Sequence, residues 1–192
     1  MSDEDTGLRA RLVDVGVELV GREGVSALTL REIARQAGVS HGAPRRYFPT
    51  HLSLLSAIAR RGFEALAREA GAAVGDGELG PREQLMALGR VYLEFARANR
   101  GMFELMFRHD LLESNRLGLR ESSLPLFEVL VGLVRRVRAL EAAEAGVVAG
   151  ALWANLHGIA QLREWGSLRL ATGSEDVEPL LRAAMDAHLG AA

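Results

Sequence analysis

The chain has 192 residues, 48% of them hydrophobic and 25% charged, with a formal net charge of -2. This balance is typical of a folded globular protein and excludes a disordered chain. The absence of cysteine excludes disulfides, thiolate metal sites and cysteine nucleophiles. Charged residues interrupt every apolar stretch before the roughly 20 residues that span a bilayer, and residues 1–5 lack the basic head of a signal peptide. We therefore expect a cytoplasmic protein with no membrane partner.

Residues 6–22 are predicted to form the first helix. Their apolar residues recur every three or four positions, as on one face of an amphipathic helix: Leu8, Leu12, Val15, Leu19 and Val20. Thr29 and Glu32 then have the spacing of a capping box, in which each side chain satisfies a free amide at a helix start. This spacing predicts a short second helix, which Gly38 ends in a left-handed conformation.

Two further helix starts follow. Ser40 is predicted as the N-cap of a short third helix that runs to about Tyr47, and Thr50 as the cap of a longer fourth helix. Residues 71–81 are rich in glycine and are the predicted linker of the chain.

Beyond the linker the pattern is helical throughout. One helix begins at Pro81 and carries Leu85, Leu88, Tyr92 and Phe95 on one face; others are predicted over residues 125–140, 142–168 and 174–189. No alternating strand pattern and no internal repeat is found, so the predicted fold class is all-α.

Basic residues concentrate in one segment. Residues 28–61 contain six arginines (Arg31, Arg35, Arg45, Arg46, Arg60 and Arg61) against the single acid Glu32. The segment therefore carries +5 and the remainder of the chain -7. This asymmetry indicates an anionic partner for the segment, or else a solvated basic helix face.

The second and third helices have the dimensions of a helix-turn-helix, whose second helix enters the DNA major groove. Gly38 permits the tight turn, Gly42 and Ala43 are small enough for a close approach to DNA, and Arg45 and Arg46 supply donors for phosphate or guanine. Two short helices around a glycine also occur in proteins that never bind nucleic acid.

The run LTLREIARQAGVSHGAPRRYFPTHLSLLSAI, residues 28–58, closely resembles the N-terminal DNA-binding segment of the TetR (tetracycline-repressor-type) family of transcriptional regulators. Residues 99–107 and 151–160, the latter with Trp153, His157 and Gly158, resemble the C-terminal domain subgroup named for its Trp-His-Gly (WHG) motif.

The resemblance implies three parts in an all-α chain. Residues 1–50 would be a three-helix helix-turn-helix DNA-binding domain, residues 51–80 a connecting helix with the Gly-rich linker, and residues 81–192 a helical bundle that binds an effector. Such a chain is expected to form a homodimer through its last two helices.

Carried over position by position, the resemblance places DNA contacts at the start of the second helix, along the third and at the start of the fourth. These residues are Thr29, Ser40, His41, Gly42, Ala43, Arg45, Arg46, Tyr47, Thr50 and His51. The sequence departs from the family at three positions. Arg45 replaces a frequent Tyr, His51 replaces a Lys that recurrently binds phosphate, and Pro44 removes one amide near the first turn. Arg45 either restores a phosphate contact or reads a guanine.

An effector site is predicted from an apolar cluster and one face of a later helix: Phe103, Met106, Phe107, Trp153, His157, Gln161 and Trp165. Each of these residues could equally be packed in the core, and a backbone carbonyl could satisfy His157. The small residues Ala145, Ala149 and Gly150 suit a dimer interface or packing within the chain.

We expect no enzyme, metal or cofactor, because the five histidines lack a zinc spacing and no nucleophile or phosphate-loop motif is present. The expected function is that of a ligand-responsive transcriptional regulator. In its simplest form it is a repressor that binds palindromic double-stranded operator DNA as a homodimer and is released by a small, largely apolar effector. The alternative is a helical ligand-binding dimer that has lost operator recognition.

Overall fold

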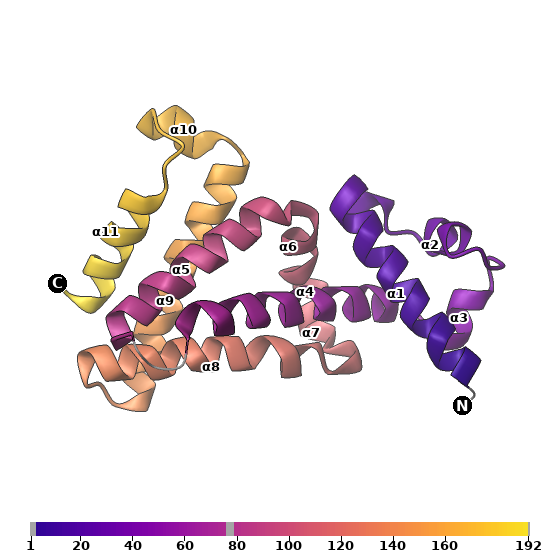
Figure 1. The fold of residues 1–192 in the computed structure, drawn as a ribbon, viewed down its shortest axis with the longest axis horizontal. Coiled ribbons are helices and arrows are strands. Elements are labelled where there is room, and N and C mark those ends of the chain that lie inside the picture. Colours follow the sequence, from indigo (N-terminus) through magenta and orange to yellow (C-terminus); the bar gives the residue numbers. More distant parts are fainter. Residues whose placement is uncertain (1–2, 76–78, 192) are drawn as a thin grey trace. The chain divides into compact units, whose positions relative to one another are not determined.

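The computed structural model describes residues 3–75 and 79–191, with side chains described from Gly7 onward. Its helices are α1 Asp3–Glu23, the 3-10 turn η1 Val25–Ala27, α2 Leu30–Gln36, α3 Ala43–Tyr47, α4 His51–Val74, α5 Pro81–Ala98, α6 Arg100–Met106, α7 His109–Ser114, η2 Arg116–Gly118, α8 Leu119–Arg138, α9 Ala142–Glu164, α10 Ser167–Thr172 and α11 Glu178–Leu189 (Figure 1). The described residues contain no strand, and the predicted all-α class is confirmed. Within them, no helix combines the length and apolar character that crossing a bilayer requires.

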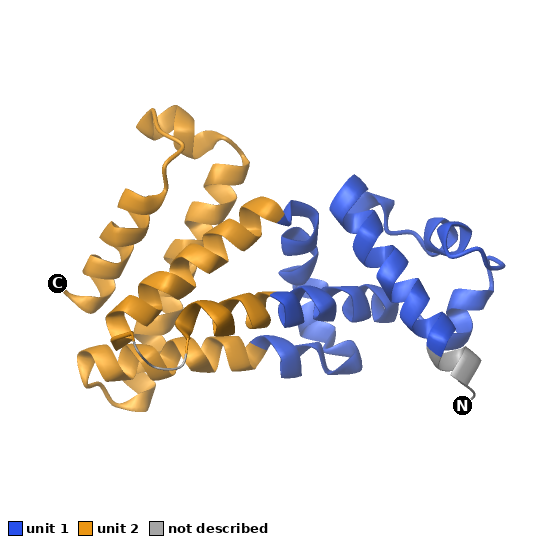
Figure 2. Cartoon of the chain, viewed as in Figure 1, with its two compact units in different colours: residues 1–65, 99–123 blue, residues 66–98, 124–192 orange. Residues whose placement is uncertain are grey.

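The chain forms two compact units (Figure 2). Unit 1 comprises residues 1–65 and 99–123, and unit 2 comprises residues 66–98 and 124–192. The change of unit falls inside α4 and inside α8, so two helices contribute to both units. The functional division predicted from the sequence, at 1–50, 51–80 and 81–192, stays a prediction.

Unit 1 is built around α1, which packs against α2, α3 and α6. Leu12, Leu19 and Ile33 are each 0% exposed, as their spacing predicts. Gly16 allows the side chain of Ile58 in α4 to approach the α1 backbone, because a Cβ there would overlap the Ile58 side chain. The predicted first helix is thus confirmed.

In unit 2, α9 packs against α5, α10 and α11. Ala145 and Ala149 are both 0% exposed, so their small side chains serve packing within the chain. At Gly89 of α5, a Cβ would meet the Leu181 side chain of α11. Ion pairs between Arg90 and Glu178 at 2.6 Å, and between Arg82 and Asp186, join α5 to α11. These pairs are partly exposed to solvent and contribute about 1 kcal/mol or less each.

Three predicted boundaries in the second half are wrong. The helix expected to begin at Pro125 begins at Leu119, and the exposed proline lies inside α8, where water can bind the carbonyl that loses its amide partner. The single helix expected over residues 142–168 is divided into α9 and α10, because Gly166 adopts a left-handed φ of 73° between them. The last helix begins at Glu178 instead of residue 174.

The predicted linker is shorter than expected. Its first four residues continue α4 to Val74, and α5 begins at Pro81, where a proline costs no helical hydrogen bond. Residues 76–78, within the predicted linker, lie outside the described residues.

Gly101→Ala is expected to destabilise unit 1. A Cβ at this position of α6 would overlap the carbonyl oxygen of Val20 and lie 3.2 Å from the Cα of Gly24. Backbone atoms cannot relieve the overlap by a change of rotamer, as a flexible side chain can. We therefore expect the free energy of unfolding to fall by about 1–3 kcal/mol, measured by urea denaturation.

Gly71→Ala is the matched control. A Cβ there meets nothing within 4 Å, and alanine in an exposed helix is more stable than glycine by about 0.5–1 kcal/mol. An equal loss of stability in both variants would contradict the close approach of α6 to α1.

Candidate functional site

The start of α2 is capped by Thr29. Its Oγ1 accepts the amide of Glu32 at 3.1 Å, which confirms one half of the predicted capping box. The Glu32 carboxylate does not accept the Thr29 amide, which donates to the Ala27 carbonyl instead. It accepts hydrogen bonds from Arg35 at 2.5 and 2.9 Å and from Gln36 at 2.7 Å, and these bonds lower the pKa of Glu32 to about 2. The charge of Arg35 is therefore compensated within α2.

The connection between α2 and α3 is longer than the sequence predicted. Gly38 has a left-handed φ of 67°, as expected. Ser40 is not the N-cap of α3. Its carbonyl accepts the Ala43 amide at 3.0 Å in a further turn, and Gly42 takes the N-cap position. The N-cap consequently lies two residues later than predicted, and α3 begins at Ala43.

Two buried residues fix the orientation of α3. Pro44 is buried near the helix start and Phe48, just after its end, is 0% exposed. The Phe48 amide donates to the Pro44 carbonyl at 2.8 Å. Arg45 and Arg46 lie between these anchors and are exposed.

The start of α4 is also capped as predicted. Thr50 Oγ1 accepts the Ser53 amide at 3.1 Å, and Ser53 Oγ accepts the Thr50 amide at 3.2 Å. His51 Nε2 donates to the Leu28 carbonyl at 2.5 Å, which joins the start of α4 to the segment before α2. Since Nε2 donates here, Nδ1 can donate to a phosphate only when the His51 ring carries both protons.

The six arginines of the basic segment have different partners. Arg35 is paired with Glu32, Arg61 with Asp14 at 2.9 Å, and Arg60 donates to the carbonyls of Leu117 and Gly118. The other three, Arg31, Arg45 and Arg46, are exposed and form no ion pair with any residue that the structure describes. The uncompensated charge is thus concentrated on α2 and α3.

The structure brings the ten predicted DNA-contact residues together in unit 1. Thr29, Ser40, His41, Gly42, Arg45, Arg46, Thr50 and His51 are exposed, and Ala43 and Tyr47 are partly exposed. Whether each contacts DNA stays a prediction.

The predicted effector residues divide between the two units. Phe103 and Met106 belong to unit 1 and are 4% and 0% exposed. The Phe107 ring lies 4.9 Å from that of Phe103 and 5.6 Å, edge to face, from that of Phe63. This packing favours the core alternative for these residues.

Trp153, His157 and Gln161 lie in α9 of unit 2, where the first two meet Tyr92 of α5. The Tyr92 hydroxyl is 2.8 Å from His157 Nδ1, and Trp153 Nε1 donates to the same hydroxyl at 3.1 Å. Gln161 lies 3.5 Å from His157 Nε2. A tyrosine hydroxyl is therefore a partner of His157. The four residues are called the Tyr92 cluster below.

Burial determines the protonation of the Tyr92 cluster. It raises the pKa of Tyr92 above its ordinary value and lowers the pKa of His157 below 6.5, because the charged form of each ring loses hydration. At neutral pH the phenol is therefore protonated and the imidazole neutral.

Tyr92 was missed as a functional residue because the sequence placed it among apolar neighbours on a packing face. Its hydroxyl was the available signal, since a buried phenol needs a hydrogen-bond partner.

Trp165, the remaining residue of the predicted effector site, follows the end of α9 and is 68% exposed. The described residues contain no group of three or more acidic or histidine side chains that could hold a metal ion.

Two family models match the chain. The model described as "Bacterial regulatory proteins, tetR family" matches residues 12–58, and "Tetracyclin repressor-like, C-terminal domain" matches residues 85–188. The HTH-type transcriptional regulator BetI of Rhizobium meliloti (strain 1021) is 40% identical over 83 residues, which are 43% of this chain and 40% of BetI. The chain thus spans about two-fifths of the length of this curated relative.

Solved structures match over nearly the whole chain. A protein of unknown function from Rhodococcus sp. RHA1 has a TM-score of 0.79 at 31% identity, covering 95% of this chain and 93% of that one. The multidrug binding protein EbrR in complex with imidazole has a TM-score of 0.63 at 27% identity, covering 96% of each chain. The chain belongs to the TetR family of bacterial transcription regulators. Its assignment to the WHG subgroup stays a prediction.

Acidification is expected to destabilise the protein through His157. The unfolded chain binds a proton on this ring near pH 6.5, whereas the folded protein does so only at lower pH. Between these values the unfolded state binds more protons, so the free energy of unfolding decreases as the pH falls. In His157→Phe this contribution to the pH dependence is expected to disappear, measured by urea denaturation from about pH 7 to pH 5.

His109→Gln is the control, because the His109 side chain is 88% exposed and its interaction with Glu113 at 3.6 Å is on the surface. It should leave the pH dependence unchanged. A His157→Phe variant with the wild-type pH dependence would show that His157 is not held neutral by burial.

Proposed function

We propose that the chain is a ligand-responsive transcriptional repressor. It binds a palindromic operator as a homodimer in the cytoplasm, and a small, largely apolar effector releases it. The observation that carries the proposal is the exposed, uncompensated pair Arg45 and Arg46 on a short helix held by buried Pro44 and Phe48. Its membership of a family of transcription regulators supports this role over an enzymatic one.

In this proposal α3 enters the major groove and the starts of α2 and α4 face phosphates. Ser40, His41 and Gly42 precede α3 and are exposed, so a base edge can reach them. Thr29 stands at the start of α2, where free amides favour an anion. Arg45 and Arg46 supply the donors that phosphate and guanine both accept.

An exposed apolar stripe on α9 supports the homodimer. Val147, Ala151, Ala154 and Leu162 are spaced by four, three and eight residues and are all exposed, Val147 by 74% and Leu162 by 41%. This spacing places them on one helix face. Since α9 is apolar on its inner face as well, a second copy is the occupant that we propose for the outer face. In this proposal the dimer interface lies on the side of α9 opposite to Ala145 and Ala149, the small residues from which the sequence predicted it.

The Tyr92 cluster is the proposed effector contact within unit 2. It offers aromatic surfaces together with three hydrogen-bonding side chains, Tyr92, His157 and Gln161, as small-molecule sites commonly do. The two helix-turn-helix regions of the dimer can be spaced so that they fit the operator, or spaced differently. An effector that binds the second arrangement more tightly shifts the dimer toward that arrangement. The difference between the two affinities is the whole free energy available for release.

Arg46→Ala is expected to lower operator affinity with fold and dimer intact. For duplex DNA, the logarithm of affinity decreases with the logarithm of salt concentration by about 0.9 per neutralised phosphate. Loss of one phosphate contact therefore reduces this slope by about 0.9, as titrations at several salt concentrations would measure. Unchanged affinity of the folded variant would contradict the assignment.

Arg45→Ala distinguishes the two roles left open for Arg45. A phosphate contact predicts the same reduction in slope, whereas a guanine contact predicts an almost unchanged slope and relaxed preference at one base pair. Arg68→Ala is the control, because Arg68 is exposed on α4 in unit 2, outside α2 and α3.

The first experiment is selection of bound sequences from a random duplex pool, with wild type and the Arg45→Ala, Arg46→Ala double variant side by side. A palindromic consensus that the double variant fails to enrich supports the repressor. If a folded wild-type dimer enriches no sequence, the proposal fails and the ligand-binding dimer without operator recognition replaces it.

A further inference from the structure

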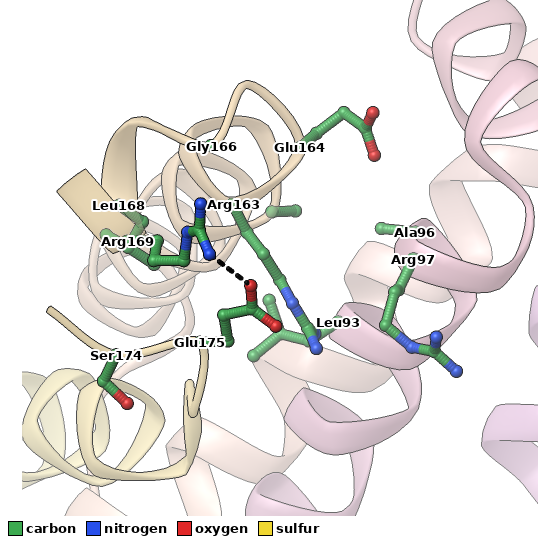
Figure 3. A pocket seen from close by; sticks show the side chains of 11 residues that line it. Leu93, Ala96, Arg97, Arg163, Glu164, Gly166, Leu168, Arg169, Ser174 and Glu175 are labelled. Atoms are coloured by element: carbon green, nitrogen blue, oxygen red, sulfur yellow. Dashed lines mark ion pairs between the residues drawn. The ribbon is translucent and has the colours of Figure 1, made fainter.

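Unit 2 contains a cavity of about 310 Å³ apart from the Tyr92 cluster (Figure 3). It is formed by α5, the end of α9, α10 and the segment that leads to α11. Its lining residues are Leu93, Ala96, Arg97, Ala160, Arg163, Glu164, Gly166, Leu168, Arg169, Ser174 and Glu175. None of them belongs to the Tyr92 cluster.

The inner wall of this cavity is apolar. Leu93 and Ala96 of α5 and Ala160 of α9 are 3%, 8% and 6% exposed, and none of these side chains carries a polar group. Gly166 and Gly173 bracket α10 with left-handed φ values of 73° and 74°. These turns place Leu168 and Arg169 on the cavity wall opposite α5.

The cationic side chains at the cavity differ in their partners. Arg169 is paired with Glu175 at 3.5 Å, and Arg97 with Glu94 at 2.5 Å. Arg163 forms no ion pair within the described part of the chain, and its guanidinium extends between Glu175 and Leu93 (Figure 3). The Glu164 carboxylate points away from the other lining side chains (Figure 3). Arg163 contributes to lowering the pKa of the Glu94 carboxylate, which is itself paired with Arg97. A guanidinium without an ion pair of its own therefore lies beside an apolar wall.

We propose that this cavity binds a small organic monocarboxylate, with its carboxylate on Arg163 and its apolar body against Leu93, Ala96 and Ala160. A planar guanidinium matches a carboxylate with two parallel hydrogen bonds. The volume is at the lower end of the range for small-molecule sites. A dianion such as phosphate would leave one charge unpaired beside apolar side chains, which is unfavourable.

Isothermal titration of the full-length protein with sodium hexanoate and sodium benzoate tests the proposal. Hexanol and benzyl alcohol supply the same apolar bodies without charge, and sodium sulfate supplies charge without an apolar body. We expect saturable binding of a carboxylate at one site per chain, weaker by about tenfold or more in Arg163→Gln. Arg68→Gln, which removes an exposed arginine outside the cavity, should bind as wild type does.

A second variant examines the apolar wall without changing charge. Ala96→Ser, which places a hydroxyl against the apolar body of the ligand, should weaken carboxylate binding while Arg163 is retained. Circular dichroism with thermal unfolding verifies that this variant and Arg163→Gln are folded. Arg163→Lys keeps the charge but loses the paired donors, so its affinity should lie between those of wild type and Arg163→Gln.

The proposal is overturned if neither carboxylate binds saturably, or if binding is unchanged in folded Arg163→Gln. It is also overturned if the alcohols or sulfate bind as well as the carboxylates. These outcomes are independent of operator binding. A protein that selects an operator but binds no carboxylate refutes this inference alone, and one that binds carboxylate but selects no DNA refutes only the repressor.

Discussion

The burial of Phe48 and Pro44 is the constraint on which the proposed DNA-binding surface depends. A helix of five residues such as α3 is not stable by itself, because nucleation costs more than so few hydrogen bonds return. Burying one phenylalanine contributes about 1.5–3 kcal/mol, and Phe48 is completely buried. The two anchors flank Arg45 and Arg46, so the packing that forms the helix also exposes its arginines.

The pairing of arginines is more informative than their number. Arg35 and Arg61 are compensated by neighbouring acids, and Arg60 donates to carbonyls at η2. Within the basic segment, the arginines left without such a partner are Arg31, Arg45 and Arg46 on α2 and α3; in unit 2, Arg163 of the cavity also has no ion pair among the described residues. The first group fits a polyanion, and the second, beside an apolar wall, fits a single carboxylate.

The Tyr92 cluster illustrates why buried polar groups occur in sets. A phenol or imidazole buried without a hydrogen-bond partner would lower the stability of the protein by about 1–3 kcal/mol. Here the Tyr92 hydroxyl is the hydrogen-bond partner of both His157 and Trp153. A ligand that enters such a set must replace the hydrogen bonds that it breaks. In the proposed effector site, these hydrogen bonds would therefore add selectivity to the apolar contact.

The sequence by itself determined what local signals encode: the amphipathic first helix, the caps at Thr29 and Thr50, and the left-handed Gly38. These depend on residues a few positions apart, so periodicity and hydrogen-bonding chemistry suffice to predict them. Tertiary structure decided where α3 begins, that Phe103 and Met106 are buried in unit 1, that Tyr92 is a partner of His157, and that Arg163 lacks an ion pair. Each of these depends on residues brought together from distant parts of the chain, and one sequence read alone does not specify which side chains will meet.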